Sequence, residues 1–348
     1  MTNRRLFIRQ AWIPFLLGFF LNAFIFVHFL GVPSRLRDVL STGKKFALDS
    51  NYADELKQVL SLGKKEQLHS LRERAATAES DDLFTKVRIF CWILTSPNNT
   101  AKAQAVKATW AKRCNKYVFV SSEDDPTLPA INSTVGEGRD RLWGKTKFGF
   151  RYAYHNSLQE YDWFVKADDD TYMILENLRH LLSAYSPSDP NYFGCELKPF
   201  VPNGYMAGGS GYVLSREALR RFVEDGLDGG RCREDHDGFE DVEAGKCLAE
   251  VGVLPVDSLD DLGRKRFFPS PPLAHIQGNR NDSEEWRDWW YKEYVKYPDG
   301  DLLDCCSDKA ISFHYIGEMD MYMMEYLIYR LKPHGLGVVR PLAADTNL

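Results

Sequence analysis

The chain has 348 residues and a formal net charge of −5 at pH 7. Its residues are 44% hydrophobic and 13% aromatic, which is enough to bury a large core and excludes wholesale disorder. The slightly acidic balance gives no sign of the basic footprint that nucleic-acid-binding proteins carry. We therefore expect a globular protein with no nucleic-acid partner.

An apolar run near the start of the chain, residues 11–32, is long enough to cross a bilayer, for which about 20 residues suffice. Arg4, Arg5 and Arg9 precede it, which fits a cytoplasmic N-terminus, although basic residues also follow it. A cleaved signal peptide is the alternative, but the run exceeds the usual apolar core of about 7–15 residues and no small-x-small site follows. The pattern favours a cytoplasmic tail at 1–10 and a single-pass type II signal anchor at 11–32.

Three N-glycosylation sequons begin at Asn98, Asn132 and Asn281. Each tripeptide also occurs by chance in cytosolic proteins, but together with the anchor they favour a body that lies in the lumen of the secretory pathway. Residues 33–85 are mostly polar, and their leucines at 56, 60, 68 and 71 recur at mostly helical offsets. This segment is either a helical stem or a solvated linker.

From about residue 86 onward, hydrophobic strands alternate with helical segments, which predicts an α/β fold with a mostly parallel, Rossmann-like sheet. In such sheets, ligands bind at the carboxyl ends of the strands. We expect one catalytic domain at 86–337 and a flexible tail at 338–348. The expected strands are residues 87–95, 117–121 and 162–167, and the expected helices are residues 102–111, 142–158 and 174–185.

Three adjacent aspartates, Asp168, Asp169 and Asp170, follow the strand expected at 162–167. Like charges repel, and partly buried carboxylates are costly unless they are paired or bind a cation. In an extended chain Asp168 and Asp170 point to the same side, so both can address one divalent ion while Asp169 points away. A helix cap by Asp170 is the alternative. Asp-x-Asp after a hydrophobic strand is typical of transferases that hold a metal on a nucleotide-sugar diphosphate.

Two further features bear on this chemistry. His314 lies in the apolar run 311–315, and an imidazole beside carboxylates would shift the metal preference toward Mn²⁺; a lone histidine in a strand is nevertheless more often a satisfied core residue. Glu240 and Asp241 precede a helical pattern, and either could take a proton from an acceptor hydroxyl. An N-cap role for Asp241 is equally open.

Two segments could contact a sugar. The glycines at 208, 209 and 211 precede an expected strand, where they allow the backbone to approach a ligand or form a bulge. Residues 286–297 are dense in tryptophan and tyrosine, including Trp286 and Trp290. Aromatic faces suit the apolar face of a sugar, but a core patch is an equally good interpretation.

From about residue 87 to residue 335 the chain resembles the core 1 β1,3-galactosyltransferases, a branch of the inverting β1,3-glycosyltransferase family. The vicinal pair Cys305-Cys306 before Phe313-His314-Tyr315 points to this branch. The stretches that carry the resemblance include 106–110, 137–140, 163–172, 208–215, 240–241, 305–308 and 312–315.

The resemblance implies a GT-A fold in the Golgi membrane and transfer of galactose from UDP-galactose to GalNAc α-linked to Ser or Thr on glycoproteins. It implies Mn²⁺ on Asp168, Asp170 and His314, with Asp241 as the general base. A homodimer and a dedicated chaperone are further implied partners. A related enzyme with another donor sugar is an alternative, as is a non-catalytic chaperone of the same fold, although that relative lacks the acidic motif. The implied donor-site residues are Thr95, Lys107, Asp140, Lys145 and Asp169, and the implied acceptor-site residues are Glu240, Gly209 and Trp286 or Trp290.

The resemblance also implies three disulfides: Cys91–Cys114, Cys232–Cys247 and Cys305–Cys306. Cys195 is then left without a partner. It is either a buried thiol or an intermolecular link, and we favour the buried thiol.

Overall fold

The computed structural model describes residues 79–277 and 290–334, all within one compact unit of the chain, Arg72–Leu348. The expected cytoplasmic tail, signal anchor, most of the stem, the C-terminal tail and Trp286 lie outside the described residues. Within the described part of the chain, no helix has both the length and the apolar character that a membrane span requires.

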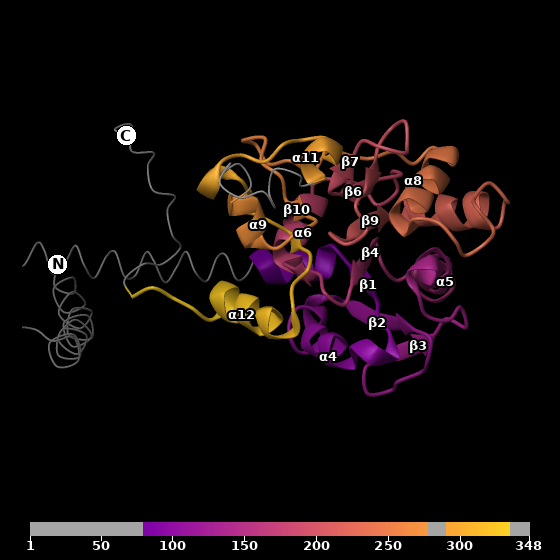
Figure 1. Ribbon diagram of the computed structural model, residues 1–348, viewed down its shortest axis with the longest axis horizontal. Helices are drawn as coiled ribbons and strands as arrows, with labels where there is room; N and C mark the ends of the chain where they lie inside the picture. The colour runs from indigo at the N-terminus through magenta and orange to yellow at the C-terminus, as the bar shows by residue number, and fades with distance from the viewer. Residues whose placement is uncertain (1–78, 278–289, 335–348) are drawn as a thin grey trace, which may run out of the picture. The chain divides into compact units, whose positions relative to one another are not determined.

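The central sheet has six strands in the order β3-β2-β1-β4-β9-β6 (Figure 1). β1, β2, β3 and β4 are parallel to one another, whereas β9 is antiparallel to both β4 and β6. The sheet is therefore mixed, but it is mostly parallel as expected, because only β9 among its strands runs against the others. The physical reason is that the chain returns from β6 to β9 through a short antiparallel pair of strands, residues 196–206, and the glycines at 208, 209 and 211, with no crossover helix in between. The strands are β1 (Ile89–Leu94), β2 (Lys116–Ser121), β3 (Ala130–Asn132), β4 (Trp163–Asp168), β6 (Tyr192–Gly194) and β9 (Tyr212–Ser215).

Both faces of the central sheet are buried. Along β1, Ile89, Cys91 and Ile93 join one hydrophobic cluster, while Phe90, Trp92 and Leu94 join the other. This alternation follows from the two-residue period of a strand, and burial on both faces explains why the segment reads as a continuous apolar run. On the second face the Trp92 ring meets the Phe150 ring of α5 edge-on, with 4.9 Å between centroids.

The three helices expected from the sequence are confirmed with small shifts. The first one ends earlier than expected, at Ala108, because the Thr109 hydroxyl bonds the Ala105 carbonyl (2.7 Å) and a short 3-10 turn, Ala111–Arg113, follows. α12 lies beside α4, and α8 lies beside α5 (Figure 1). The helices are α4 (Thr100–Ala108), α5 (Leu142–Ser157), α6 (Leu175–Leu182), α7 (Arg216–Arg220), α8 (Glu240–Glu250), α9 (Pro272–Gln277), α11 (Tyr291–Tyr294) and α12 (Glu318–Tyr329), with a π-helical turn at Arg221–Leu227.

Two small sheets complete the fold. β7 (Glu196–Leu197) pairs with β8 (Tyr205–Met206), and a three-stranded sheet has the order β10-β11-β5. The latter joins β5 (Tyr172–Met173), which follows the acidic run, to β11 (Ser312–Phe313), which precedes His314. β10 (Phe267–Phe268) lies on its other side. Through this pairing, two segments far apart in the sequence become neighbours.

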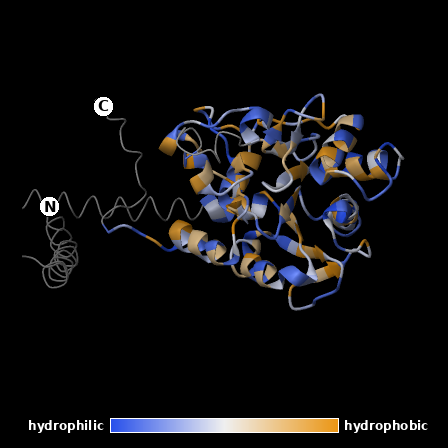
Figure 2. Ribbon diagram, in the orientation of Figure 1, coloured by the Kyte–Doolittle hydropathy of each residue, from blue (hydrophilic) through white to orange (hydrophobic). Residues whose placement is uncertain are grey.

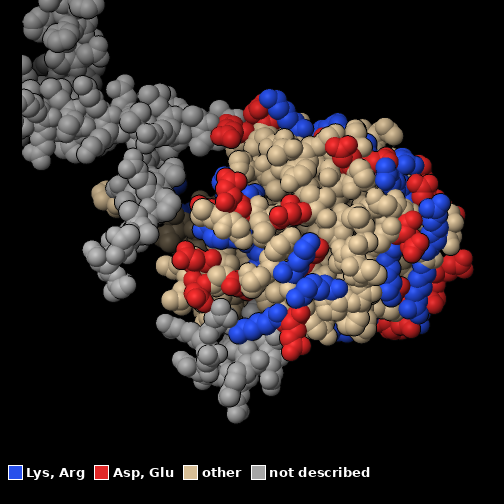
Figure 3. Space-filling view, turned by 90° about the horizontal axis from the view of Figure 1, so that it is seen from above, with Lys and Arg blue, Asp and Glu red and all other residues tan. Residues whose placement is uncertain are grey.

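The last described helix, α12, is held to the rest of the unit by a partly buried ion pair. Arg113 binds both oxygens of Glu325 at 2.9 and 2.8 Å, and its guanidinium lies 3.6 Å from the centre of the Tyr329 ring. The opposite side of α12 leaves Met319 and Met323 exposed. Figure 2 shows the helix largely in the orange of hydrophobic residues. Seen from above, the face in Figure 3 carries basic and acidic side chains intermingled along one edge, beside a large uncharged area.

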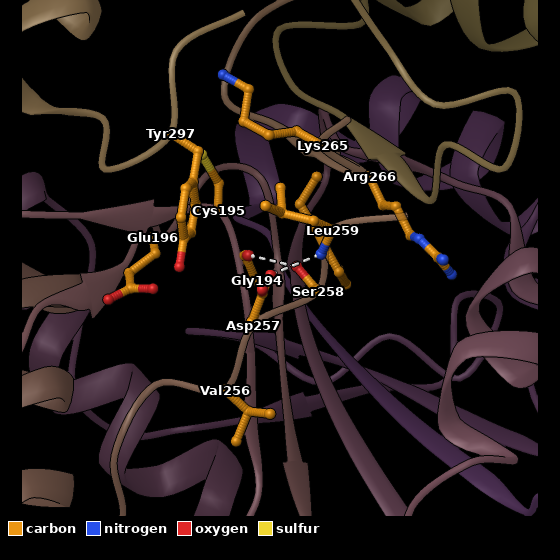
Figure 4. Close-up of a pocket in the computed structure, with 11 residues that line it drawn as sticks. Gly194, Cys195, Glu196, Val256, Asp257, Ser258, Leu259, Lys265, Arg266 and Tyr297 are labelled. Atoms are coloured by element: carbon orange, nitrogen blue, oxygen red, sulfur yellow. Dashed lines mark hydrogen bonds between the residues drawn. The ribbon is translucent and has the colours of Figure 1, made fainter. Parts of the chain in front are cut away.

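The three implied disulfides are present: Cys91–Cys114, Cys232–Cys247 and Cys305–Cys306. Cys195 is free and only 3% exposed, so the expectation of a buried thiol is confirmed and an intermolecular link is not accessible to it. Burial raises the pKa of this thiol to about 12, which keeps it protonated and unreactive. Figure 4 shows Cys195 beside a cavity of about 10 Å³, where the Ser258 hydroxyl donates to the Gly194 carbonyl (3.3 Å). This volume holds at most one water molecule.

Candidate active site

An open cleft of about 630 Å³ lies at the carboxyl ends of β1 and β4. The sheet ends there in Leu94 and Asp168, and α8 begins on another side of the cleft with Glu240 and Asp241. This is the edge where an α/β sheet binds ligands. The residues that line the cleft are Leu94, Arg139, Asp140, Leu142, Lys166, Asp168, Gly208, Gly209, Asp237, Gly238, Phe239, Glu240, Asp241, His314 and Tyr315.

One side of the cleft gathers Asp168, Asp170 and His314. A ligand atom of each lies within 4.8 Å of the other two, and His314 Nε2 is 3.1 Å from Asp170 Oδ1 and 3.9 Å from Asp168 Oδ2. The pairing of β11 with β5 places His314 there, and the Ile316 N–H bonds the Asp170 carbonyl at 2.9 Å. Two carboxylates and one imidazole, converging at this spacing, fit a divalent cation.

The surroundings of Asp170 favour its charged form. Burial would raise the pKa of Asp170, but its hydrogen bond with His314, the charge of that ring and the nearby Lys102 hold the pKa below its ordinary value. The Lys102 ammonium reaches from α4 to 3.4 Å from Asp170 Oδ2. Asp170 does not cap the helix that follows, because α6 begins only at Leu175 and its N-cap is Ile174. The helix-cap alternative is therefore wrong.

Asp169 points away from these ligands into a buried network. It accepts a hydrogen bond from the Thr95 hydroxyl (2.8 Å), while burial, with the charges of Asp170 and Asp168 adding, raises its pKa to about 6. The Lys145 ammonium donates to the Thr95 carbonyl (2.9 Å) and to Glu137 (2.6 Å). One connected group is thus formed by Thr95, Lys145 and Asp169. All three were expected at the donor site, but none of them lines the cleft itself.

The remaining expected donor and acceptor residues are not all brought together. Asp140 lines the cleft, whereas Lys107 donates to the Thr127 carbonyl and does not line it. Trp290 packs against Tyr294, with ring centroids 5.5 Å apart, and does not line the cleft either. Gly209 does: a Cβ at this position would come within 2.2 Å of the His314 ring, so glycine is what allows the imidazole to approach.

The other side of the cleft is built on the first turn of α8. Glu240 is buried and accepts hydrogen bonds from the Tyr212 hydroxyl (2.7 Å) and the Thr146 hydroxyl (3.0 Å). Its neighbour Asp241 lines the cleft, held only by backbone donors: Gly208 N–H bonds Oδ2 at 3.1 Å. The N-cap of α8 is Phe239, so an N-cap role for Asp241 is excluded. Burial raises the pKa of Asp241, and the Gly208 N–H and Lys166 oppose the rise.

Lys166 contacts residues on both sides of the cleft. It is a functional residue that the sequence pattern did not single out. Its ammonium, nearly inaccessible on β4, lies 2.6 Å from Asp168 Oδ1, 3.5 Å from Glu240 Oε2 and 3.0 Å from the Gly208 carbonyl. Burial would lower the pKa of Lys166, but Asp168 and Glu240 raise it above its ordinary value. A lysine inside the apolar stretch 163–167 was the available signal, because a buried ammonium needs carboxylates around it. Arg139, Phe239 and Tyr315 were missed as well.

Residues 79–258, more than half of the chain, match the Fringe-like family. The chain belongs to the Fringe-like family. The glycoprotein-N-acetylgalactosamine 3-beta-galactosyltransferase 1 of Xenopus laevis is 48% identical to this Fringe-like chain over 257 residues, which cover 74% of the chain and 70% of the frog protein. The beta-1,3-glucosyltransferase of Mus musculus is 32% identical over 174 residues, or 49% of the chain but only 35% of the mouse protein.

Among solved structures, the Fringe-like chain is similar to the galactosyltransferase LgtC in complex with donor and acceptor sugar analogs, with 11% identity and a TM-score of 0.39 over 70% of this chain and 97% of that one. The Fringe-like match includes Asp168, Asp170 and Asp241 but ends before His314. The third member of the candidate metal set is thus supplied by the C-terminal part of the unit.

Proposed function

We propose that this Fringe-like protein is an inverting β1,3-galactosyltransferase that moves galactose from UDP-galactose to the 3-hydroxyl of GalNAc α-linked to Ser or Thr. One observation carries the proposal: Asp168 and His314 of the candidate cation set line the same cleft as Asp241, a separate carboxylate with a raised pKa. The 48% identity to the frog galactosyltransferase supports the choice of galactose and of the GalNAc acceptor.

Asp168, Asp170 and His314 are the residues that would hold a divalent cation, and the imidazole favours Mn²⁺ over Ca²⁺ or Mg²⁺. When bound, such an ion neutralises the charge that develops on the leaving diphosphate. The Thr95 hydroxyl holds Asp169 by a hydrogen bond, and Lys145 in turn holds the Thr95 carbonyl, while Asp168 lines the cleft. The Lys166 ammonium orients Asp168 from the side opposite to His314 by direct contact with Oδ1.

Asp241 is the general base of the proposal. Its Oδ1 accepts from the Val242 N–H and its Oδ2 from the Gly208 N–H, so the carboxylate is held in place yet keeps lone pairs for an acceptor hydroxyl. Glu240 is unsuited to the task, because its buried oxygens already serve Tyr212, Thr146 and Lys166. The proton of the acceptor hydroxyl passes to Asp241 while the oxygen displaces the diphosphate in one step, which inverts the anomeric centre.

The wider setting of the enzyme rests on the family resemblance: a Golgi membrane location with a type II anchor, a homodimer and a dedicated chaperone. A second candidate function is transfer of another sugar by the same chemistry. The 32% identity to the mouse glucosyltransferase favours glucose as the donor to test against galactose.

The test is a donor competition with the purified full-length chain, Mn²⁺ and a GalNAc-α-Thr peptide. UDP-galactose, UDP-glucose and UDP-GlcNAc are offered separately, and the product linkage is determined by NMR. We expect β1,3-linked galactose, with the other donors turned over at least about tenfold more slowly, because a sugar isomer loses hydrogen bonds in a fitted site. A faster reaction with glucose, an α-linked product or no transfer at all would overturn the proposal.

A further inference from the structure

Phe239 is a large apolar side chain left in the open. It is 76% exposed, although phenylalanine is among the residues most often buried. It lines the cleft two positions before Asp241. Of the exposed large hydrophobic residues in the described part of the chain, only Phe239 and Tyr315 line this cleft.

The backbone fixes Phe239 in this position from both sides. Gly238 has a φ of +108°, a conformation that favours glycine, and a Cβ there would come within 2.8 Å of the Glu243 side chain. On the other side, Glu240 is anchored by hydrogen bonds to Tyr212 and Thr146. The Phe239 carbonyl accepts the Glu243 N–H at 2.9 Å and so starts α8. The ring is therefore presented to the cleft by an ordered turn.

Tyr315 occupies the metal side of the cleft in a comparable way. It is 57% exposed and has a φ of +56°, which is rare for a bulky residue and marks backbone strain of the kind found at functional sites. Its ring, however, already has a partner, because it stacks on His314 with 3.9 Å between centroids. Phe239 has no aromatic partner among the described residues, so its face is free for a ligand.

We propose that Phe239 is a specificity-determining contact for the acceptor, whose ring packs against the apolar C–H face of the N-acetylhexosamine. The inference rests on the proposed function. The acceptor hydroxyl must come within about 2.6–3.2 Å of Asp241, and Phe239 lines the same cleft, so the acceptor sugar is within reach of the Phe239 ring. A galacto-configured ring has an axial 4-hydroxyl, so one of its faces is a continuous run of C–H groups, and such a face packs well on an aromatic ring.

The rival ligand for an exposed aromatic ring is the uracil of the donor, and the experiment separates the two. The full-length chain is compared with its Phe239→Ala and Phe239→Tyr variants. Leu262→Ala serves as the matched control, because Leu262 is also 76% exposed but does not line the cleft. The measurements are kcat, KM for a GalNAc-α-Thr peptide, Kd for UDP in Mn²⁺, Tm, and saturation-transfer NMR of the peptide without donor.

For Phe239→Ala we expect the acceptor KM to rise about tenfold, with kcat, UDP Kd and Tm nearly unchanged and the saturation-transfer signal of the sugar ring lost. Phe239→Tyr keeps the ring and should restore the KM to within about threefold, and Leu262→Ala should behave as wild type. An unchanged acceptor KM overturns the inference, and a weakened UDP Kd reassigns the ring to the donor and overturns it too. Failure of the proposed function looks different: the wild type then transfers no galactose, while its peptide-binding signal still reports on Phe239.

Discussion

The acidic run at the end of β4 and the Glu240-Asp241 pair at the start of α8 both bring adjacent carboxylates to the candidate site, and both divide them between two roles. In each, one carboxylate is buried and bonded by hydroxyl donors: Thr95 for Asp169, and Tyr212 with Thr146 for Glu240. A neighbour in the chain, Asp168 in the first case and Asp241 in the second, lines the cleft. Adjacent acidic residues thus divide between holding the site together and facing the ligand.

The two regions differ in the charges around the carboxylate to which the proposal gives a chemical role, Asp170 in the first and Asp241 in the second. Asp170 has the His314 ring and Lys102 beside it, and its pKa is held low. Asp241 has only backbone N–H groups within hydrogen-bonding distance, and burial raises its pKa. A carboxylate that stays charged suits a cation, whereas one with a raised pKa suits a proton. The same residue type is therefore tuned for two kinds of chemistry.

The largest effect is expected for Asp241→Asn, which keeps the size of the side chain and an oxygen for the Gly208 N–H but removes the base. We expect kcat to fall about 10³-fold, while the Kd for UDP in Mn²⁺ stays within about twofold, because a base acts in the transition state. Initial rates and calorimetry measure the two. A kcat within about tenfold of wild type would mean that the α8 pair does not supply the base.

Asp170→Asn tests the other region. Loss of one charged ligand should weaken Mn²⁺ binding by about 100-fold and lower kcat/KM at fixed Mn²⁺ to a similar extent. The affinity can be followed by electron paramagnetic resonance of free Mn²⁺. Asp140→Asn is the matched control, because Asp140 lines the cleft outside the three-residue set. Equal loss in both variants would show that the metal is not held by Asp170.

The difference in pKa predicts a pH profile. The base must be deprotonated, so activity is present above the pKa of Asp241 and is lost as the pH falls through it. Because burial raises this pKa, the acid limb of log kcat against pH should lie above the ordinary aspartate value of about 3.9. The profile is measured at saturating Mn²⁺ and both substrates. An acid limb at or below the ordinary value would contradict the assignment.

The smallest effect is expected for Thr95→Val, which removes the hydroxyl that bonds Asp169 and leaves a buried oxygen without that donor. We expect the free energy of unfolding to fall by about 1–3 kcal/mol, with little change in the Kd for Mn²⁺. Urea unfolding measures the first quantity. Thr85→Val, at an exposed position, should change stability by less than about 0.5 kcal/mol. A free energy of unfolding equal to that of the wild type would show that the hydrogen bond between Thr95 and Asp169 does not stabilise the fold.

Much of the central sheet could be predicted from the sequence, since β1, β2 and β4 and three helices lie within a few residues of the expected segments. These elements have strong local signals: long apolar runs and helical periodicity. The antiparallel entry of β9 could not be predicted in this way, because strand direction depends on the path of the whole chain. The short strands of the small sheets have too few residues to give a pattern.

The candidate site was predictable only in part. Asp168 and Asp170 follow from strand alternation, but His314 required the family resemblance, because nothing near it in the sequence indicates its pairing with the acidic run. Asp241 could not be separated from a helix cap until the start of α8 was known. Lys166 is a charged residue in an apolar strand, and Phe239 is an apolar residue exposed to solvent. In both cases the residue type conflicts with its position, and only the tertiary surroundings explain why.

The small sheet that places His314 also sets the order in which the site can be completed. All six strands of the central sheet lie before residue 216, whereas the imidazole comes from β11 and the residues after it. At roughly 5–20 residues per second, synthesis of the chain between Asp170 and His314 takes roughly 7–29 seconds. A growing chain can thus build its scaffold well before it can close the proposed cation set. Binding of a divalent cation at the proposed set would then report that the C-terminal part has docked, and would mark a fully assembled unit.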